Sequence, residues 1–473
     1  MLYMQKRSIV TIFFLIVVVL AACRVGRNYE RPALVLPEQF NSQPQAPSDS
    51  SIAGVEWKQF FTDPTLLALI DSTLKGNYDL QLALKRIESA QSYVKQAKVA
   101  WLPSLGLQAT ASTTSPSKNS LNGISLSSFL KTSHIEDYTL AANLSWEIDV
   151  WGKIKRQKEA ALAAYLQSYE GAHAVQTELV ANVANSYYNL LMLDEQLQIA
   201  KHNVALSDSI VQMMRLQKAA GEVTELAVQQ ATAQQQTAAL LVPQLEQGIA
   251  IQENGLRILA GQLPGTLARN GSLEDIRMWE QLNTGLPAEL ISKRPDVRAA
   301  EMDLVAANAQ VGVAQASMYP TLTLTGTGGL NSYKAAHWFD INSLFGTVAG
   351  GITQPIFQRR QLKTQLEQAK IARDEAAIRF RQQALNAIGE VSNALVSLDK
   401  LQAQRQIATD QVKTLDVAIE QSRMLFRSGL ANYLEVITAQ SNSLQAQLTR
   451  ADVVRQQLSA GVELYRSLGG GWK

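Results

Sequence analysis

An internal repeat constrains the fold of this chain more than any other feature. The heptapeptide WLPSLGL at 101–107 returns as MYPTLTL at 318–324, an offset of 217 residues. Asp79 and Asp296 lie upstream of the two heptapeptides at the same offset. A similarity carried by residues far apart along the chain predicts that each half builds the same structural elements in the same order.

A second pair of positions extends the repeat toward the C-terminus. Gly221 and Gly429 are each followed five residues later by a leucine and ten residues later by an alanine, at an offset of 208 residues. The smaller offset predicts an insertion in the first half, most simply in the Ser-rich stretch 112–133. We therefore expect a first repeat at 57–265 and a second at 287–473, each ordered helix, strand, loop, strand, long helix, turn, long helix.

Each half contains a long stretch without proline that predicts an unusually long helix. Residues 152–220 and 361–428 are rich in Ala, Gln, Leu, Lys and Glu, which favour helices. About 65 helical residues would extend about 100 Å. A solvated coiled-coil rod is the alternative, but each stretch directly follows a strand candidate, which favours a helical tube continuous with the strands. Gly221 and Gly429 are suited to the left-handed position where such helices reverse.

Alternating side chains predict two strands in each half, at about 103–114, 136–150, 320–331 and 343–357. In the second of these strands every other residue from Tyr138 to Ile148 is apolar and most residues between them are polar. Strands of about 10 to 14 residues can cross a bilayer when tilted, although the edge of a soluble sandwich would also alternate. Four strands cannot close a membrane barrel, which needs about eight, so several chains must share one; three copies would supply twelve.

The N-terminus has the pattern of a bacterial export signal. Lys6 and Arg7 precede an apolar run at 9–20 of about 12 residues, shorter than the ~20 that a spanning helix needs. We therefore expect a signal peptide at 1–22. Leu-Ala-Ala-Cys resembles a lipobox, which implies cleavage before Cys23 and acylation of that residue; a chance cysteine is the alternative. Cys23 is the only cysteine, so the chain has no intrachain disulfide.

Residues 23–56 contain four prolines among Gln, Ser and Asn, and predict an extended, lipid-anchored arm before a folded body that begins near Trp57. Arg24, by resemblance to bacterial lipoproteins, is compatible with sorting to the outer membrane. Beyond the signal no apolar run reaches 18 residues. If the exported chain spans a membrane, we expect it to do so as a closed barrel.

Composition argues against a nucleic-acid partner and against catalysis. The net charge is +2 and 18% of the residues are charged, so no basic surface is expected. The four histidines, at 134, 173, 202 and 337, have no metal-ligand spacing. The glycines at 326–329 fit neither nucleotide-binding motif. We expect no enzyme, no metal and no cofactor other than the covalent lipid on Cys23.

Motifs along the whole mature chain resemble the outer-membrane factors of the TolC superfamily, in the lipoprotein (NodT/OprM-like) branch of tripartite efflux systems. This resemblance is carried by the lipobox, Asn28-Tyr29 with Arg31-Pro32, the stretch WEIDVWG at 146–152, RPDV at 294–297, QPIF at 354–357, Gly429 with NYL at 432–434, and LGGGW at 468–472.

The resemblance implies a fold and a set of partners. The fold is an α+β membrane channel: a homotrimer with a twelve-stranded β-barrel, continuous with a periplasmic α-helical barrel, and with an equatorial segment at 266–286. The partners are a periplasmic adaptor protein, an inner-membrane proton-driven transporter reached through that adaptor, and outer-membrane lipid. The adaptor is expected to dock on the hairpin tips, at Gly221, Arg427, Ser428 and Gly429.

The resemblance also implies a periplasmic gate on the second-half hairpin, with Leu434 as an apolar ring. Family members often carry Asp where Thr438 stands, which weakens any expectation of a charged latch there. Glu435 would supply a negative ring, or is simply a solvated surface glutamate.

The function implied is that of an outer-membrane exit channel of a tripartite efflux pump, which passively conducts small molecules such as drugs. The protein is expected to be lipid-anchored in the outer membrane and to extend into the periplasm. The outlet of a type I protein-secretion system is the alternative with the same fold. A lipid-anchored structural rod would explain neither the alternating strands nor the repeat that pairs them.

Overall fold

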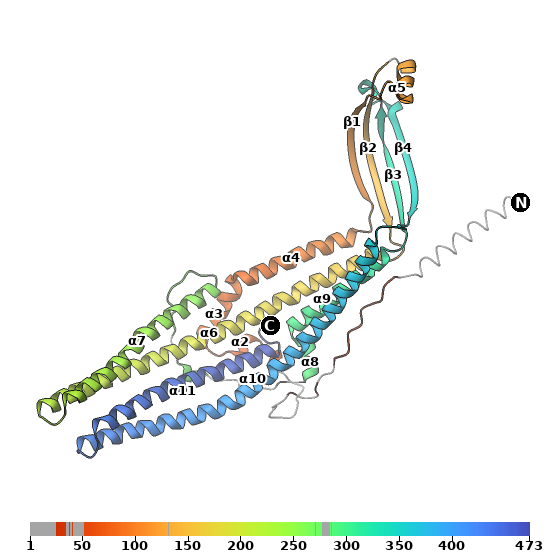
Figure 1. Ribbon diagram of the computed structural model, residues 1–473. Helices are drawn as coiled ribbons and strands as arrows, with labels where there is room; N and C mark the ends of the chain where they lie inside the picture. Colours follow the sequence, from red (N-terminus) through yellow and green to blue (C-terminus); the bar gives the residue numbers. More distant parts are fainter. Residues whose placement is uncertain are drawn as a thin grey trace. The chain divides into compact units, whose positions relative to one another are not determined.

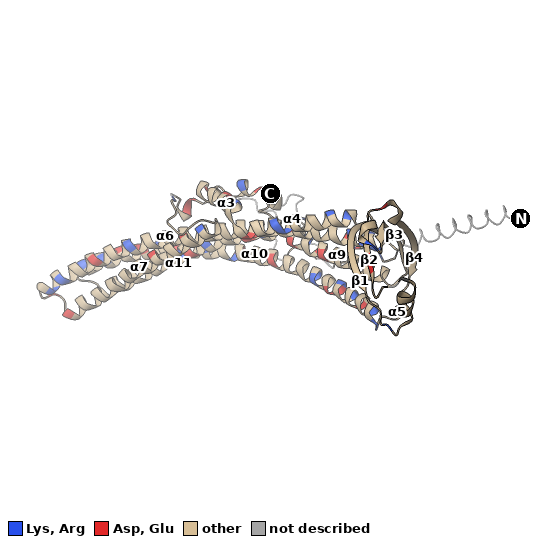
Figure 2. Ribbon diagram, turned by 90° about the horizontal axis from the view of Figure 1, so that it is seen from above, with Lys and Arg blue, Asp and Glu red and all other residues tan. Residues whose placement is uncertain are grey.

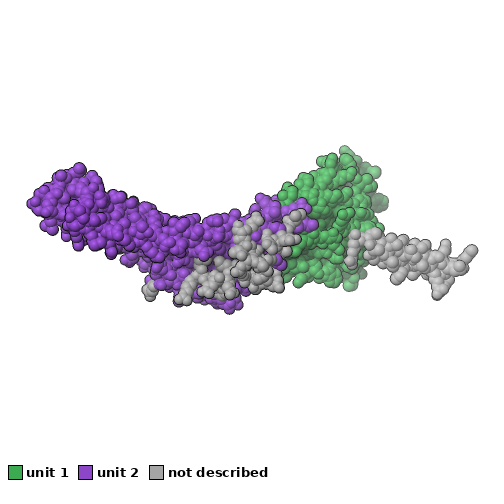
Figure 3. Space-filling model, turned by 90° about the horizontal axis from the view of Figure 1, so that it is seen from below, with its two compact units in different colours: residues 1–32, 88–166, 302–378 green, residues 33–87, 167–301, 379–473 purple. Residues whose placement is uncertain are grey.

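The computed structural model describes residues 25–34, 37, 40, 52–130, 132–269, 271–276, 284 and 286–473. The predicted signal peptide and Cys23 lie outside these residues. The chain divides into two compact units (Figure 3). Unit 1 holds Glu88–Leu166, Met302–Ile378 and the N-terminal residues up to Pro32, and unit 2 holds Ala33–Ile87, Gln167–Glu301 and Arg379–Lys473.

The two halves contain matching elements in the same order, as the predicted repeat requires (Figure 1). Helices α4 (Tyr78–Val99) and α9 (Pro295–Ala316) have 22 residues each. The two long helices, α6 (Lys153–Ala219) and α10 (Gln361–Arg427), have 67 each. Helices α7 (Glu225–Leu259) and α11 (Tyr433–Ser467) have 35 each. None of the described helices is both long and apolar enough to cross a bilayer.

The strands are β1 (Ser104–Thr114), β2 (Ile135–Ile148), β3 (Thr321–Ser332) and β4 (Leu344–Thr353). The shorter elements are η1 (Ile52–Gly54), α2 (Trp57–Phe60), α3 (Pro64–Gly76), α5 (Leu121–Ser125), η2 (Leu126–Leu130), η3 (Leu273–Asp275), α8 (Pro287–Lys293), η4 (Ala335–His337) and η5 (Ile341–Ser343). Helix α5 and the π-turn η2 occupy the Ser-rich stretch that the sequence predicted as a loop insertion.

Two strands end earlier than the sequence predicted. Strand β4 stops at Thr353 rather than near 357, because Pro355 has no N–H to continue the ladder. Strand β2 stops at Ile148 rather than near 150. Asp149 instead caps the first turn of α6. Its carboxylate accepts hydrogen bonds from the backbone N–H groups of Ile154 and Lys155, at 3.1 and 3.0 Å.

Both long helices end in the same turn, at the glycines that the repeat singled out. Gly221 has φ +81° and its N–H bonds the carbonyl of Lys218, while the next N–H bonds that of Gln217. Gly429 has φ +73° and repeats the pattern with Phe426 and Leu425. A left-handed residue closing paired 5→2 and 6→1 bonds is a Schellman motif, which glycine adopts without a Cβ penalty.

The apolar core of unit 2 draws on residues far apart in the sequence. Tyr465 of α11 is 1% exposed, stacks on Phe60 at 4.1 Å between ring centroids, and donates its hydroxyl to the carbonyl of Val55. Phe40 and Ile52 are buried in the same core. The prediction of an extended arm up to residue 56 is therefore wrong at its C-terminal end, because these apolar side chains gain by leaving water.

The start of the described chain is also held against helices, within unit 1. The Arg156 guanidinium donates to the carbonyl of Gly26 at 2.8 Å and to the amide oxygen of Asn28 at 3.1 Å. Gly26 has φ +91°, and a Cβ there would lie 3.0 Å from the Cα of Gly312. The positive φ and this close approach both favour glycine at position 26. Together with the Arg156 hydrogen bonds they hold this part of the predicted arm against the helices.

Arg294 ties three segments of unit 2 together. Its side chain is almost wholly buried and donates two hydrogen bonds to Asp296, one to Glu390 of α10 at 2.7 Å, and one to the carbonyl of Ser467 at the end of α11. Burial disfavours the charged form of Asp296, but the bonds and charge of Arg294 outweigh it and hold the pKa of Asp296 below its ordinary value. The sequence predicted only a helix start here.

Replacing Arg294 with methionine should strongly destabilise the protein. The change leaves Asp296 without its buried counter-charge and Glu390 with Arg466 as its remaining cationic partner, which costs about 3–5 kcal/mol. Thermal unfolding of the purified protein should show a clearly lowered midpoint. Lys75→Met is the matched control: Lys75 pairs with Asp71 at 2.6 Å on an exposed helix surface, where ion pairs contribute little. Equal midpoints for the two variants would contradict this account of Arg294.

Candidate functional site

The four strands form one antiparallel sheet in the order β1-β2-β3-β4, and their registers give it two different faces. Leu105 lies opposite Leu144, Trp146 opposite Leu324, and Leu322 opposite Ile352, so apolar residues meet apolar residues on one face. The other face carries the paired polar residues Thr110, Ser112, Asp137, Thr139, Asn143, Ser145, Thr323, Thr325, Thr327, Asn331 and Thr347.

Side-chain hydrogen bonds run across the polar face. Thr327 donates to the amide oxygen of Asn143 at 3.0 Å. Asn331 donates to Asp137 and to the hydroxyl of Thr139, both at 2.8 Å. All four strands lie within the described residues, and they contain no lysine or arginine. Most of the lysines and arginines instead lie on the helices (Figure 2). The sheet is thus apolar on one side and neutral-polar with few carboxylates on the other.

Aromatic side chains lie at both ends of the sheet. At one end the Trp146 indole donates to the carbonyl of Trp101 at 2.8 Å, and the Trp151 indole donates to that of Pro320 at 2.7 Å. At the other end Tyr138 lies 5.5 Å from Trp338, measured between ring centroids. Rings with an apolar body and a polar edge are suited to the two interfaces of a membrane.

The three residues that were predicted to form the gate lie on one exposed surface at the tip of the second hairpin. Leu434 is 46% exposed, and Glu435 and Thr438 are exposed as well. Val436, between them, is buried. Asn432 caps this helix by accepting the N–H groups of Leu434 and Glu435. Their role as a gate stays a prediction.

The turns that were predicted to dock an adaptor are exposed too, at Gly221, Arg427, Ser428 and Gly429. The Ser428 hydroxyl bonds the carbonyls of Met424 and Leu425 at 3.1 and 3.0 Å, which satisfies the end of α10. The hydrogen bonds of the backbone at this tip are therefore satisfied within the chain, and docking of an adaptor here stays a prediction.

Contacts between the two hairpins were not foreseen from the sequence. A small apolar cluster near the tips includes Met214 of α6, Ala227 of α7 and Val436 of α11. Polar contacts flank it: the Tyr433 hydroxyl donates to Gln230, and Gln440, 1% exposed, donates to Ser207 at 3.2 Å. These residues look like ordinary helix surface in the sequence, and only tertiary packing brings them together.

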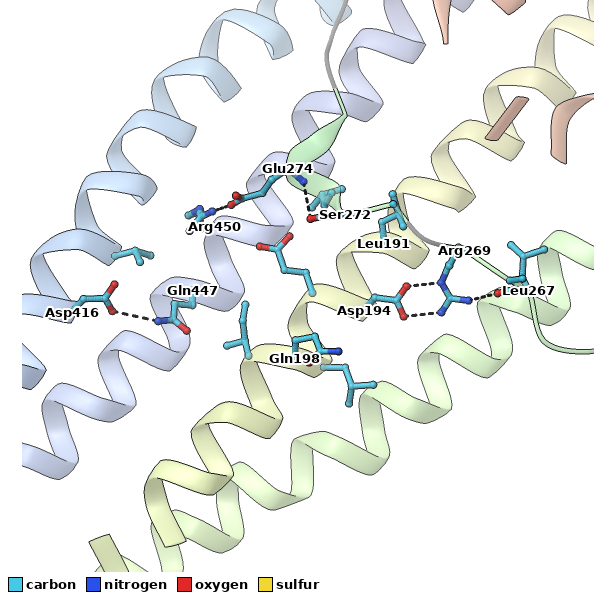
Figure 4. Close-up of a pocket in the computed structure, with 17 residues that line it drawn as sticks. Leu191, Asp194, Gln198, Leu267, Arg269, Ser272, Glu274, Asp416, Gln447 and Arg450 are labelled. Atoms are coloured by element: carbon cyan, nitrogen blue, oxygen red, sulfur yellow. Dashed lines mark hydrogen bonds and ion pairs between the residues drawn. The ribbon is translucent and has the colours of Figure 1, made fainter. Parts of the chain in front are cut away.

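A hollow of about 940 Å³ opens in unit 2 between α6, α10, α11 and residues 267–274 (Figure 4). The Arg269 guanidinium donates two hydrogen bonds to the Asp194 carboxylate of α6, at 2.5 and 2.7 Å, and a third to the Glu253 carboxylate of α7. Glu274 pairs with Arg450 of α11. The described part of the predicted equatorial segment is therefore fastened to both hairpins.

The charges of the hollow are arranged for structure rather than chemistry. The pKa of Glu195, which lines it, is raised by burial, although Arg450 opposes the shift. Among the described residues no group of three or more His, Cys, Asp or Glu is placed to hold a metal ion. The arrangement offers no nucleophile with a paired base.

Three curated relatives cover almost the whole chain. A probable outer membrane lipoprotein, SilC of Salmonella typhimurium, is 28% identical over all of both chains. The cation efflux system protein CusC of Escherichia coli is 28% identical, covering 97% of this chain and 98% of its own. The pyoverdine export outer membrane protein OpmQ of Pseudomonas putida is 31% identical, covering 93% of each.

Solved structures and a family profile agree with these relatives. The outer-membrane channel OprN superposes with a TM-score of 0.86 at 28% identity, over 95% of this chain and all of its own. CusC superposes with a TM-score of 0.83 at 26% identity, with the same coverage. The profile of the outer membrane efflux protein family matches residues 69–262 and 286–470. The chain therefore belongs to this family, and it is an outer-membrane channel protein of an efflux system.

Proposed function

We propose that three copies of the chain enclose one conduit, with the polar sheet face inside and the apolar face toward lipid. The segregation of the two faces is the observation that carries this proposal, because a lipid-facing wall must be apolar while the lumen is wet. Strands β1 and β4 are the outer strands of the sheet, each with one unpaired edge. Pairing β1 of one copy with β4 of the next satisfies these edges.

Exposed apolar residues on the helices support assembly from copies as well. On α10, Ile371, Ile378 and Leu385 recur at seven-residue intervals and are 51–63% exposed. On α7, Ile251 and Ile258 repeat that interval with 63% and 60% exposure. A seven-residue apolar repeat is the pattern by which helices pack lengthwise against other helices. Neighbouring copies would cover these stripes and complete a helical tube.

The conduit does no chemistry in this proposal. A periplasmic adaptor binds the exposed hairpin tips and links the channel to a proton-driven inner-membrane transporter, which supplies the energy. The relatives range from a cation efflux system protein to a pyoverdine export protein, at similar identity to this chain. We therefore assign the choice of substrate, whether drug, metal ion or siderophore, to the transporter rather than to the duct.

Deleting the gene should make the host more susceptible to at least one class of exported compound. The experiment compares the parent, the deletion strain and a complemented strain on a panel of antibiotics, solvents and metal salts. At least a fourfold fall in inhibitory concentration, restored by complementation, is expected for a lost efflux outlet. Unchanged susceptibility across the panel, together with a lost secreted protein, would instead favour the secretion outlet.

We also propose that a lipid on Cys23 anchors the channel. Val25, two residues later, donates its N–H to the carbonyl of Trp151 at 3.4 Å, just after β2. Arg156 then holds Gly26 and Asn28. These contacts support an acyl chain that enters the bilayer beside the Trp151 end of the sheet. The relative SilC is named a probable outer membrane lipoprotein.

Cys23→Ser should abolish lipidation, since serine has no thiol to acylate. Mass spectrometry of the N-terminal peptide should show acyl groups on the wild-type protein and none on the variant. Arg24→Gln, which leaves the thiol in place, is the control and should stay acylated. An unacylated wild-type peptide would exclude the lipid anchor.

For the gate we propose a constriction formed by Leu434 around the three-fold axis. The exposure of this leucine in a single chain, and the burial of Val436 behind it, support an apolar side chain aimed at other copies. An apolar ring narrows and dewets a pore. Glu435 adds a negative ring beside it, and Thr438, one turn further on, adds no charge.

Leu434→Ala should raise the single-channel conductance in planar bilayers, because it removes the side chain that narrows the closed pore. We expect an increase of about twofold or more. The matched control is Leu226→Ala, at the equivalent position of the first hairpin, which is 58% exposed and should leave conductance unchanged. Identical conductance in Leu434→Ala and wild type would contradict the proposed gate.

A further inference from the structure

Two carboxylates on the polar face of the sheet differ in their surroundings. Glu147 pairs with the Lys153 ammonium at 3.0 Å, so its charge is balanced within the chain. Asp137 is exposed and accepts hydrogen bonds from two neutral donors, Asn331 at 2.8 Å and Thr139 at 3.0 Å. No lysine or arginine of the described chain forms an ion pair with it. The Asp137 carboxylate thus has no counter-charge within the described chain on this face.

The register defines where that charge points. Asp137 lies opposite Ser112 of β1, next to the Thr139–Asn331 pair, and all four belong to the polar face. It lies near the start of β2, at the end of the sheet away from Trp151 and the long helices. Bonds from Asn331 and Thr139 restrict its rotamers, so the carboxylate is held along the wall instead of moving freely.

From this arrangement we propose that Asp137 determines charge selectivity at the outer end of the conduit, where it attracts cations and repels anions. The inference rests on the closed conduit proposed above. Three copies place three unbalanced carboxylates at one level of a wall that has no lysine or arginine on its strands. A ring of like charges around a narrow pore concentrates its electric field in the lumen and raises the counter-ion concentration there.

The other charged groups of the described chain near this end lie off the polar face. Glu136 precedes it in β2 but lies on the opposite, apolar face, where it accepts the Tyr138 hydroxyl at 3.0 Å. His134 lies 4.0 Å from Glu136. Lys334 extends over the Tyr333 ring, at 5.3 Å from its centroid. Lys118 and Asp340 lie in the connections beyond the strands. None of these side chains lies on the polar face of a strand.

Asp137→Asn tests the proposal with little structural change, since the amide oxygen still accepts the bonds of Asn331 and Thr139. Purified wild-type and variant channels are inserted into planar bilayers between about 10 mM and about 100 mM KCl, where screening lengths are about 30 and 10 Å. The reversal potential then reports the ratio of potassium to chloride permeability. We expect this ratio to fall about twofold or more in Asp137→Asn.

Two further variants sharpen the measurement. Asp137→Lys should push the ratio beyond that of Asp137→Asn, toward anion preference. Glu136→Gln removes a carboxylate from the adjacent residue on the other face, and should leave the ratio unchanged. The Asp137 effect should also vanish near 1 M salt, where screening acts within about 3 Å.

The outcomes separate this inference from the proposed conduit. A wild-type protein that forms no ion-conducting channel would overturn the conduit and the selectivity role with it. Channels that conduct normally but keep the wild-type ratio in Asp137→Asn and Asp137→Lys would overturn the selectivity role alone. It would also fall if Glu136→Gln shifted the ratio equally, or if Glu435→Gln at the hairpin tip accounted for the whole preference.

Discussion

The register of the β-sheet is the constraint on which the rest of this protein depends. Side chains alternate along each strand, so a slip of one residue in any pair would mix the two faces. The observed pairing keeps Leu105, Leu144, Gly326 and Val348 in one row across all four strands. A slip by an odd number of residues would bring polar side chains onto the apolar face, so the observed register keeps one face apolar and the other polar.

The helical part depends on other contacts, which hold the long helices side by side. Several of these contacts come from single residues that bridge separate segments. Arg294 joins the start of α9 to α10 and to the end of α11, while Arg269 joins the connecting segment to α6 and α7. The hairpin tips rely on a small apolar cluster with polar bonds beside it. Removing one of these bridging residues leaves a buried charge or donor unpaired, so each contributes more to stability than a surface contact does.

The channel function depends on the sheet and on the helical hairpins together. The sheet provides a wall whose polar face can contact water and solutes, and the hairpins present exposed turns to partners. The Asp137 carboxylate adds a chemical preference to an otherwise neutral wall, because the neutral donors around it position its charge without balancing it.

The sequence by itself determined the repeat, the four strands, the two long helices and the glycine turns, because alternation, proline-free runs and left-handed glycines are local signals. It also pointed to Leu434, Glu435 and Thr438, whose exposure agrees with a gate without testing it. Strand ends were predicted less well, since Asp149 and Pro355 act through backbone bonds that periodicity does not show. Only the tertiary structure decided the partners of Arg156, Arg269, Arg294 and Asp137. Those partners lie up to about 190 residues away in the chain, and the same residue types would read as solvated surface charges until packing selects one neighbour for each.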